Sequence, residues 1–380
     1  MNGSGKRLPQ LRTLIISPAR WSSFHLSKHF VAQALADLGS SVLYIDPPLS
    51  PLSLIRHPER LTDLRGRRVS DIDARLSVWR PVVVPGQNSR IGQFVNGLIL
   101  ERGIRRLIWP PELTLAFSLE ARALLGRAPG RRIYHCTDSF EDLPGADAAD
   151  VRRRERAVIA ASDAVSACSR PLVEQLGRQG TAAVYVPHGC DPGAVAAPPT
   201  PPPGLRDRPR PWVGYVGSLN FRLDSSLLEA ARRANAGGTL VLVGGRFAAA
   251  PDPATERLLA LSDVVSVPQQ PPGAVPGIMA SLDAGIVPYS IHPFNRKSFP
   301  IKIMQYLAAG VPVVSTPNGA TDELGDHVLV AEDPRSFGAA VGRVLERPSQ
   351  DQKDARRAVA MARPWTRVAA ELVEAAGVAL

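Results

Sequence analysis

The chain has few cysteines, few aromatic residues and no long hydrophobic run. Its 380 residues include Cys136, Cys168 and Cys190, an odd number without the Cys-x-x-Cys spacing of zinc or redox sites. Apolar runs stay short of the ~20 residues that a membrane helix needs, and the apolar run near the N-terminus lacks the length and cleavage site of a secretory signal. We therefore expect buried thiols in a cytoplasmic protein, without a disulfide framework or a metal site.

Charge is unevenly distributed along the chain. Residues 1–195 contain 26 basic and 18 acidic side chains, whereas the remainder contains 19 and 17. The arginine clusters of the first part favour an anionic partner such as a membrane surface, although a GC-rich genome would also enrich arginine. Nucleic acid is the competing partner, but aromatic residues make up only 6% of the chain, and neither zinc spacing nor a recognition helix accompanies the arginines. We expect no nucleic-acid partner.

Short apolar segments alternate with helical patterns in the first half of the chain, which indicates an α/β fold with a parallel sheet. A helix after the first segment should end at Gly39. The expected strands are 11–17, 41–46, 76–84, 106–109, 131–136, 164–167 and 182–187.

A proline-rich segment, 196–211, interrupts this alternation, and a second α/β series follows it. The length of the chain suits two domains. We expect a first domain at 1–195, a linker at 196–211, a second domain at 212–363 and a closing helix within 364–380. The strands of the second domain are expected at 212–217, 239–244, 263–267, 284–289, 311–315 and 327–331, with helices between them and two more before the C-terminus.

Residues 298–316, SFPIKIMQYLAAGVPVVST, predict a helix that runs directly into a strand. Ser298 is an expected N-cap, Pro300 suits the first turn, and Gly310 suits the left-handed helix end. Lys302 and Gln305 lie on the polar face and lean toward the helix N-terminus, where an anion is favoured. A lone lysine is more often a solvated surface residue, so the prediction needs other cations.

Further basic and flexible residues follow expected strands of the second domain. Gly217 and Arg222 lie in the loop GSLNFRLD, in which Asp224 is an expected helix N-cap. Gly244 begins a glycine pair after the next strand. Asn295, Arg296 and Lys297 precede the helix that carries Lys302, and this clustering favours a phosphate site.

Together these segments resemble the nucleotide-sugar-binding half of GT-B glycosyltransferases, particularly the retaining, family-4-like enzymes of glycosyl transferases group 1. VGYVGSLNFRLD, DAGIVPY and PIKIMQYLAAGVPVVST resemble three parts of that half, and VYVPHGCD (184–191) resembles the crossing between domains. WTRVAAELVEAA (365–376) resembles the closing helix that packs on the first domain, and YHCTDSF (134–140) resembles the segment that faces the donor from that domain.

The resemblance implies two doubly wound, Rossmann-like domains that face each other across a cleft. It implies transfer without a metal or cofactor, in which Asp138 and His135 act near the sugar and protein cations stabilise the departing diphosphate. A histidine directly after strand residues is more often structural. The donor, a UDP- or GDP-linked sugar, is expected to bind Gly217, Asn220, Arg222, Gly244, Asn295, Lys302 and Gln305.

Two positions depart from the family pattern. The best-known members carry acidic residues at the positions of Lys297 and Gln305, so the donor and the activity itself are open. On the acceptor side we expect Arg20, Trp21 and His25, where helix capping and core packing are equally good explanations.

We expect a transferase that moves a sugar to a cell-envelope polysaccharide or lipid-linked acceptor at the inner membrane face. The alternatives are a sugar-nucleotide 2-epimerase and an inactive sugar-nucleotide-binding scaffold. A bilobed solute-binding protein would need an export signal.

Overall fold

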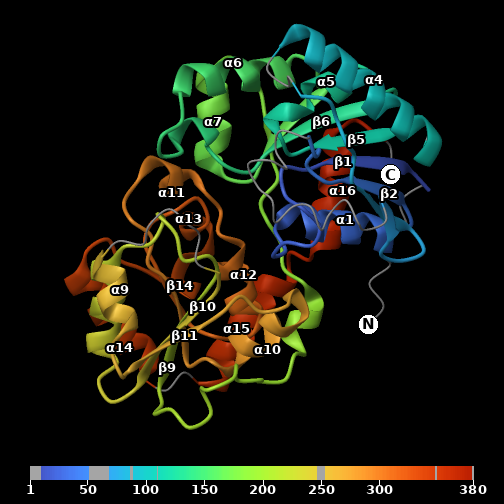
Figure 1. Ribbon diagram of the computed structural model, residues 1–380. Helices are drawn as coiled ribbons and strands as arrows, with labels where there is room; N and C mark the ends of the chain where they lie inside the picture. The colour runs from blue at the N-terminus through green and yellow to red at the C-terminus, as the bar shows by residue number, and fades with distance from the viewer. Residues whose placement is uncertain are drawn as a thin grey trace. The chain divides into compact units, whose positions relative to one another are not determined.

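We describe a computed structural model of the chain (Figure 1) over residues 10–50, 68–85, 89–108, 110–245, 253–346 and 349–378, leaving aside the side chains of residues 90 and 93. The chain forms two compact units. The first contains residues up to Pro187 and the segment from Trp365 onward, and the second contains His188–Pro364. The first unit is therefore built from both ends of the sequence.

The first unit has an eight-stranded sheet within its described residues. All neighbouring strands pair in parallel except β3 and β4, which are antiparallel. The strand order, with bounds, is β3 (Val69–Asp71), β4 (Leu76–Trp79), β2 (Ser41–Ile45), β1 (Arg12–Ile16), β5 (Leu113–Ala116), β6 (Arg131–Cys136), β7 (Ala164–Ala167) and β8 (Val184–Tyr185).

Helices connect and cover these strands. They are α1 (Ser27–Asp37), α4 (Arg90–Leu107), α5 (Arg122–Leu125), α6 (Ala148–Ile159), α7 (Arg170–Arg178) and α16 (Trp365–Ala375), with short 3-10 turns at Leu119–Ala121 and Phe140–Asp142. In Figure 1 the red helix α16 lies among the blue elements of this unit, beside α1. The Phe30 and Trp365 rings stack with centroids 5.2 Å apart, which joins the two sequence segments through buried aromatic surface.

The second unit has a six-stranded, wholly parallel sheet in its described part. The strand order is β11 (Val264–Val267), β10 (Thr239–Val243), β9 (Trp212–Val216), β12 (Ala284–Val287), β13 (Val313–Ser315) and β14 (Val328–Val330). Its helices are α8 (Ser225–Ala234), α9 (Pro253–Leu259), α10 (Val275–Ser281), α11 (Pro293–Lys297), α12 (Ile301–Ala308), α13 (Thr321–Leu324), α14 (Pro334–Leu345) and α15 (Gln350–Met361), with 3-10 turns at Pro192–Val195, Pro272–Ala274 and Gly325–His327.

The central strands of both sheets are apolar because helices cover both faces. Every residue of β9, β10 and β12 is buried, the pattern expected of parallel strands. The prediction of two parallel, Rossmann-like α/β units is confirmed. Ligands of such sheets bind beyond the carboxyl ends of the strands, and the loops that follow β1, β6, β9 and β12 are therefore the relevant ones.

Local predictions failed in several places. The central strand β5 and the edge strand β3 were not predicted. Residues 106–109 were expected to form a strand, but α4 continues to Leu107, because its buried side packs against the sheet. Two helices were expected after the last strand, but three follow β14. They are α14 and α15, which end the second unit, and α16, which belongs to the first. The 182–187 strand is reduced to Val184–Tyr185.

The passage between units also differs from the expected boundary at residue 195. The chain enters the second unit at His188 and leaves it after Pro364. The proline-rich segment 196–211 is not a free linker, because Leu205 is fully buried and the Thr200 N–H donates to the Gly277 carbonyl at 2.8 Å. Proline there gives extended backbone that packs within one unit.

Candidate functional site

Two cations meet at the carboxyl end of β9 in the second unit. Lys302, in the first turn of α12, is only 9% exposed, and its Nζ lies 3.7 Å from the centroid of the Tyr215 ring. The Arg222 guanidinium carbon lies 4.5 Å from the centroid of the Tyr289 ring. Aromatic faces attract cations but do not neutralise them. The described ion pairs include no carboxylate partner for either cation.

Burial and neighbouring charges shift the pKa values of this cluster. Burial, reinforced by repulsion from the nearby Arg222 charge, lowers the pKa of Lys302 to about 8, although Tyr289 opposes the shift. Burial would raise the pKa of the Tyr289 phenol, but Arg222 and Lys302 outweigh burial and lower it. An anion placed beside the two cations would relieve this repulsion.

Arg222 is held by a network of neutral groups. Its Nε donates to Asn295 Oδ1 at 2.9 Å, and its Nη2 donates to Ser298 Oγ at 2.6 Å. Asn295 is 1% exposed, and its amide donates to the Ser290 carbonyl at 3.0 Å. Two of the five guanidinium N–H donors are thus used to fix the orientation of the fork. Asn295 therefore positions Arg222 from inside the fold.

Two glycines let the backbone approach the cations closely. Gly217 has φ of 148°, and a side chain there would overlap the Lys302 ammonium. Gly244 has φ of 157°, and a side chain there would overlap the Gly217 carbonyl. L-residues rarely adopt these angles. The two loops can lie against each other and against Lys302 only because both positions are glycine.

The start of α12 differs from the prediction. The helix begins at Ile301 with Pro300 as its N-cap, and Ser298 instead terminates α11 and accepts a hydrogen bond from Arg222. Lys302 therefore lies in the first turn rather than the second. The His188 ring bonds to the Phe299 carbonyl at 2.9 Å, which fixes the approach to the helix. Gly310 ends α12 with φ of 78° as predicted.

The remaining predicted residues of this region have more local roles. Asn220 Oδ1 accepts from the Arg222 backbone N–H at 3.1 Å, so it shapes the loop. Gln305 is half-buried one turn after Lys302 on α12. Arg296 is exposed and pairs with Glu332 at 3.2 Å, so it stands apart from Lys302 and Arg222. Asp224 caps α8 as predicted.

In the first unit, the predicted catalytic residues lie at the end of β6. His135 is 1% exposed, its Nδ1 bonds to Ser166 Oγ at 2.8 Å, and its ring meets the edge of Phe117. Asp138 is half-buried in the loop beyond the strand. Direct chemistry is therefore easier for Asp138 than for His135, whose surroundings suit a positioning role. The catalytic role of both residues stays a prediction.

The sequence analysis missed Lys28, a buried lysine beside Asp138. It lies in the first turn of α1 and is 5% exposed. Burial lowers the pKa of Lys28, whereas electrostatic interaction with Asp138 and, to a smaller extent, Cys168 raises it. In the sequence Lys28 resembles any lysine of an amphipathic helix, and only the tertiary structure reveals its burial.

The loop after β1 is filled by aromatic side chains. Trp21 packs on His25 and on Tyr44, at centroid distances of 5.5 and 5.1 Å, and His25 stacks on the buried His29 at 4.9 Å. His29 Nδ1 accepts from the Leu26 N–H at 2.9 Å, so its Nε2 donates to the Arg20 carbonyl. Burial lowers the pKa of His29 to about 4. The predicted residues Trp21 and His25 therefore belong to a neutral cluster.

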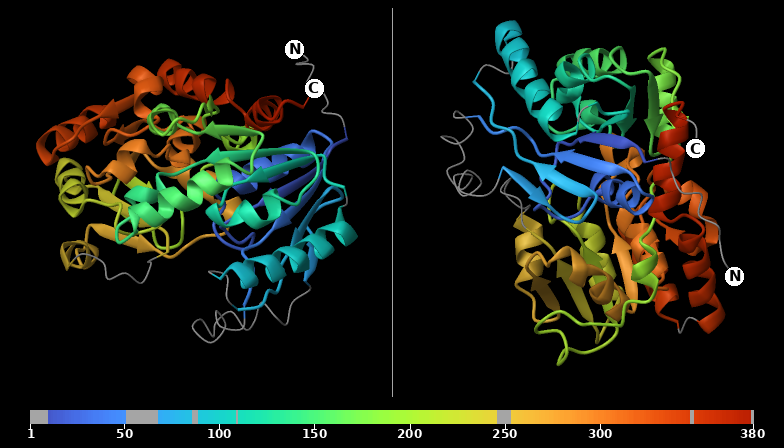
Figure 2. Two further views of the ribbon diagram at one scale, coloured as in Figure 1. Left: turned by 90° about the horizontal axis from the view of Figure 1, so that it is seen from above. Right: turned by 90° about the vertical axis from the view of Figure 1, so that its right-hand side faces the viewer.

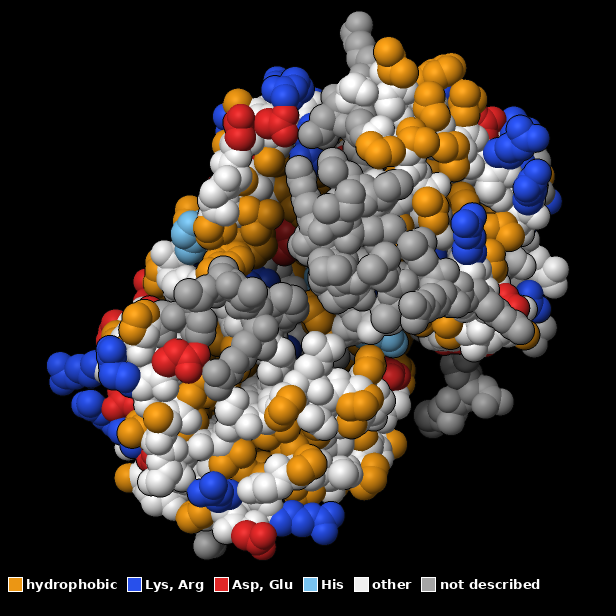
Figure 3. Space-filling model, viewed as in Figure 1, with side chains coloured by type: hydrophobic (Ala, Val, Ile, Leu, Met, Phe, Trp, Pro, Cys, Tyr) orange, Lys and Arg blue, Asp and Glu red, His pale blue; other side chains and the backbone are white. Residues whose placement is uncertain are grey.

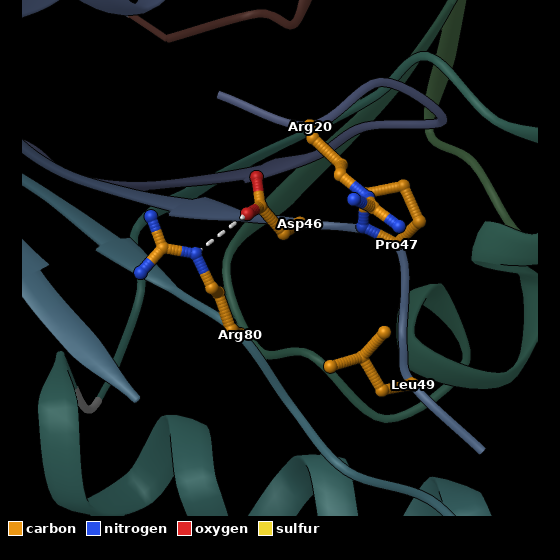
Figure 4. Close-up of a pocket in the computed structure, with 5 residues that line it drawn as sticks. All are labelled: Arg20, Asp46, Pro47, Leu49 and Arg80. Carbon is orange, nitrogen blue, oxygen red and sulfur yellow. Dashed lines mark ion pairs between the residues drawn. The ribbon is translucent and has the colours of Figure 1, made fainter. Parts of the chain in front are cut away.

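A small pocket adjoins this cluster (Figure 4). Arg80 Nε pairs with Asp46 Oδ2 at 3.3 Å. Burial raises the pKa of Asp46, although the charges of Arg80 and Arg20 oppose the shift. Figure 4 shows the predicted residue Arg20 over Pro47, with Leu49 lining the opposite wall. Two guanidinium groups and one carboxylate leave the pocket with a positive balance.

Three further properties concern the chain as a whole. Cys136, Cys168 and Cys190 are buried free thiols, as predicted. Within the described ranges, no group of three or more metal-binding side chains gathers. Over the same residues no helix has both the length and the apolarity to cross a bilayer.

Sequence comparison finds similarity to known glycosyltransferases in part of the chain. Residues 210–347 match the model of the family described as glycosyl transferases group 1. The chain is also 29% identical over 177 residues to TuaH of Bacillus subtilis (strain 168), a provisionally named teichuronic acid biosynthesis glycosyltransferase. That similarity covers 44% of this chain and 43% of TuaH, so less than half of this relative is matched.

Structural comparison extends the similarity to nearly the whole chain. Sucrose-phosphate synthase from Thermosynechococcus elongatus has a TM-score of 0.72 at 17% identity, covering 95% of this chain and 97% of the synthase. HepE of Anabaena, solved with UDP and glucose, has a TM-score of 0.67 at 14% identity, covering 96% of this chain and 98% of HepE. The predicted GT-B fold is confirmed.

Proposed function

We propose that this chain, whose residues 210–347 belong to the glycosyl transferases group 1 family, transfers a sugar from a nucleotide-sugar donor to an acceptor hydroxyl. The observation that carries the proposal is the pair formed by the buried Lys302 and the half-buried Arg222, which have no carboxylate partner among the described ion pairs. A diphosphate supplies the missing negative charge. The uridine diphosphate in HepE supports this ligand class.

In the proposed reaction, the bond between the anomeric carbon and the diphosphate oxygen breaks and its electron pair remains on the phosphate. The acceptor oxygen bonds to the same carbon on the same face, and its proton passes to the departing phosphate oxygen. Lys302, Arg222 and the first N–H groups of α12 stabilise the developing charge electrostatically. Because these protein groups stabilise the departing diphosphate, we expect the reaction to need no metal ion. Activity should therefore survive chelation by EDTA.

We further propose roles for two residues of the first unit and a class of acceptor. Asp138 is proposed to orient a hydroxyl of the sugar or the acceptor, with His135 behind it. The acceptor is proposed to be a cell-envelope polysaccharide or a lipid-linked sugar at the cytoplasmic membrane face. The association of TuaH with teichuronic acid supports this class, and the basic pocket of Arg20 and Arg80 suits an anionic acceptor.

Nucleotide binding and turnover test the proposal directly. We expect Lys302→Ala and Arg222→Ala each to weaken UDP or GDP binding and to reduce nucleotide release by about 10²-fold or more. Arg296→Ala is the matched control, because its guanidinium is exposed and pairs with Glu332. Unchanged affinity in both site variants would contradict the proposal.

A binding protein without turnover is the second candidate. Gln305 and Lys297 occupy positions where the best-known members carry carboxylates, and a neutral amide can only share hydrogen bonds with a sugar or ribose hydroxyl. Incubation with nucleotide sugars and envelope-type acceptors separates the candidates. Nucleotide release favours the transferase, and a changed sugar without release favours an epimerase. Saturable binding without either product favours the scaffold.

A further inference from the structure

Helix α4 presents an apolar stripe to solvent. Ile91, Phe94 and Leu98 are 78%, 59% and 46% exposed, and their spacing of three and four residues aligns them along the helix. Figure 2 shows α4 at the outside of the first unit, and Figure 3 shows hydrophobic side chains gathered over it. Exposed apolar side chains that gather in this way mark interaction sites more often than isolated ones do.

The opposite side of α4 fixes this orientation. Leu100 and Ile104 are buried, and Gly103 packs so closely on the Trp79 ring that a side chain there would overlap it. Asn96 accepts from the Val84 N–H at 2.9 Å and donates to the Val84 carbonyl at 3.0 Å. Because the inner side is anchored, the apolar stripe cannot turn toward the core.

Arginines continue the stripe and border it. Arg102 and Arg105 follow Leu98 at helical spacing, and Arg106 is exposed beside them. Arg127 crosses the helix with its guanidinium carbon 5.1 Å from the Phe94 ring centroid. Glu101 pairs with Arg105 at 2.9 Å and with Arg127 at 3.3 Å. Among these described side chains, four positive charges therefore stand against one negative charge.

We propose that this surface docks the first unit onto an anionic lipid bilayer. The three apolar side chains enter the boundary between headgroups and acyl chains, and the arginines bind lipid phosphates. Charge complementarity favours this occupant over a second copy of the chain, because an isologous contact through α4 would bring like charges together. The α4 surface comprises Ile91, Phe94, Leu98, Arg102, Arg105, Arg106 and Arg127.

The inference rests on the proposed function, because a membrane-bound acceptor gives the transferase a reason to dock there. Both parts of the α4 surface are needed. An apolar stripe alone would bind neutral and anionic lipid alike, whereas arginines alone would bind weakly and release at high salt.

Flotation of the full-length chain with vesicles tests the surface. We expect wild type to float with phosphatidylglycerol and phosphatidylcholine vesicles, and far less with phosphatidylcholine alone. Substitution of the three apolar residues by serine should weaken partition at least about tenfold. Arg102→Gln with Arg105→Gln should remove most of the preference for anionic lipid.

The control removes three other exposed apolar residues, which lie in the second unit. Leu261, Val330 and Met361 are 39%, 45% and 41% exposed, and their replacement by serine should leave flotation unchanged. The proposal is overturned if wild type shows no preference for anionic vesicles, or if the control variant loses as much binding. It is also overturned if light scattering shows a dimer that the α4 substitutions dissociate.

Nucleotide binding separates this proposal from the proposed function. The α4 variants should retain wild-type affinity for UDP or GDP while they lose lipid, because they lie outside the cation pair. If wild type binds neither nucleotide but still prefers anionic vesicles, the proposed function fails and the α4 surface stands. If affinity for nucleotide falls together with flotation, the substitutions have damaged the fold and the surface assignment is overturned.

Discussion

The loops after the first strand of each sheet occupy equivalent places in two doubly wound domains, yet they are built differently. After β9, Gly217 brings the backbone against the Lys302 ammonium. After β1, the loop contains no glycine, and Tyr44 fills the space with its hydroxyl bonded to Ser17 Oγ at 2.6 Å. The second unit places its backbone against a cation, whereas the first fills its loop with neutral rings.

Under the proposed function, this difference gives the two units separate tasks. The second unit supplies positive charge that is already oriented, and preorganised charge is what a departing diphosphate requires. The first unit places a half-buried carboxylate, Asp138, beside the buried Lys28. The comparison therefore predicts that donor affinity depends on the second unit and that turnover depends on both.

The largest expected effect concerns Asp138. We expect Asp138→Asn to reduce turnover by at least about 10²-fold, since a neutral amide orients a hydroxyl less strongly than a carboxylate does. Donor affinity, measured by calorimetry, should change little. The control is Asp37→Asn, which changes an exposed carboxylate of α1. A loss of donor affinity equal to the loss of turnover would contradict the division between units.

The glycine pair of the second unit gives the next effect. Gly244→Ala should destabilise the protein by at least about 3 kcal/mol, because it adds backbone strain at φ of 157° and overlap with the Gly217 carbonyl. Gly342→Ala in α14 has open space around the new side chain and should be neutral or slightly stabilising. Urea unfolding measures both variants. Equal stability of the two variants would show that close backbone approach is not needed there.

The neutral cluster of the first unit is expected to limit stability in acid. The pKa of His29 is about 4 in the folded protein against 6.5 when unfolded. Its contribution is therefore complete above pH 6.5 and is lost as the pH falls toward 4, up to about 3 kcal/mol. His29→Gln preserves one acceptor and one donor without titrating. The unfolding free energy of this variant should fall less than that of wild type between pH 7 and 4.5.

The smallest expected effect is the pH dependence of donor binding. The pKa of Lys302 is about 8, so the ammonium that attracts the diphosphate is lost as the pH rises through that value. Affinity for the nucleotide should be constant below pH 7 and about tenfold weaker at pH 9. Lys302→Arg, which stays protonated, should abolish this transition. A transition retained in the arginine variant would assign the titration to another group.

The sequence predicted the cation pair well and the first unit poorly, for physical reasons. Lys302 and Arg222 could be found because both follow apolar strand patterns and lie among other cations. Lys28 and His29 could not, since their importance arises from burial by segments distant in sequence. The helix start was misplaced because Ser298 resembles an N-cap, although Pro300 takes that position and leaves the serine oxygen for Arg222.

The same limits explain the fold errors. Both sheets were predicted because apolar runs with period-specific spacing persist without tertiary contacts. Residues 106–109 were assigned to a strand because they include a few apolar residues. Instead α4 extends to Leu107, since Gly103 lets the helix pack closely on the Trp79 ring. The segment 196–211 was expected to link the domains because proline suggests extension, and only the buried Leu205 shows that it packs.

The closing helix α16 makes the first unit depend on a segment that is synthesised after the second unit. Val368 and Leu372 of this helix are fully buried in the unit that begins with β1. A nascent chain can therefore complete the second unit on the ribosome while the first still exposes the apolar surface that α16 will cover. A chain that stops before Trp365 should therefore retain a complete second unit and an incomplete first unit.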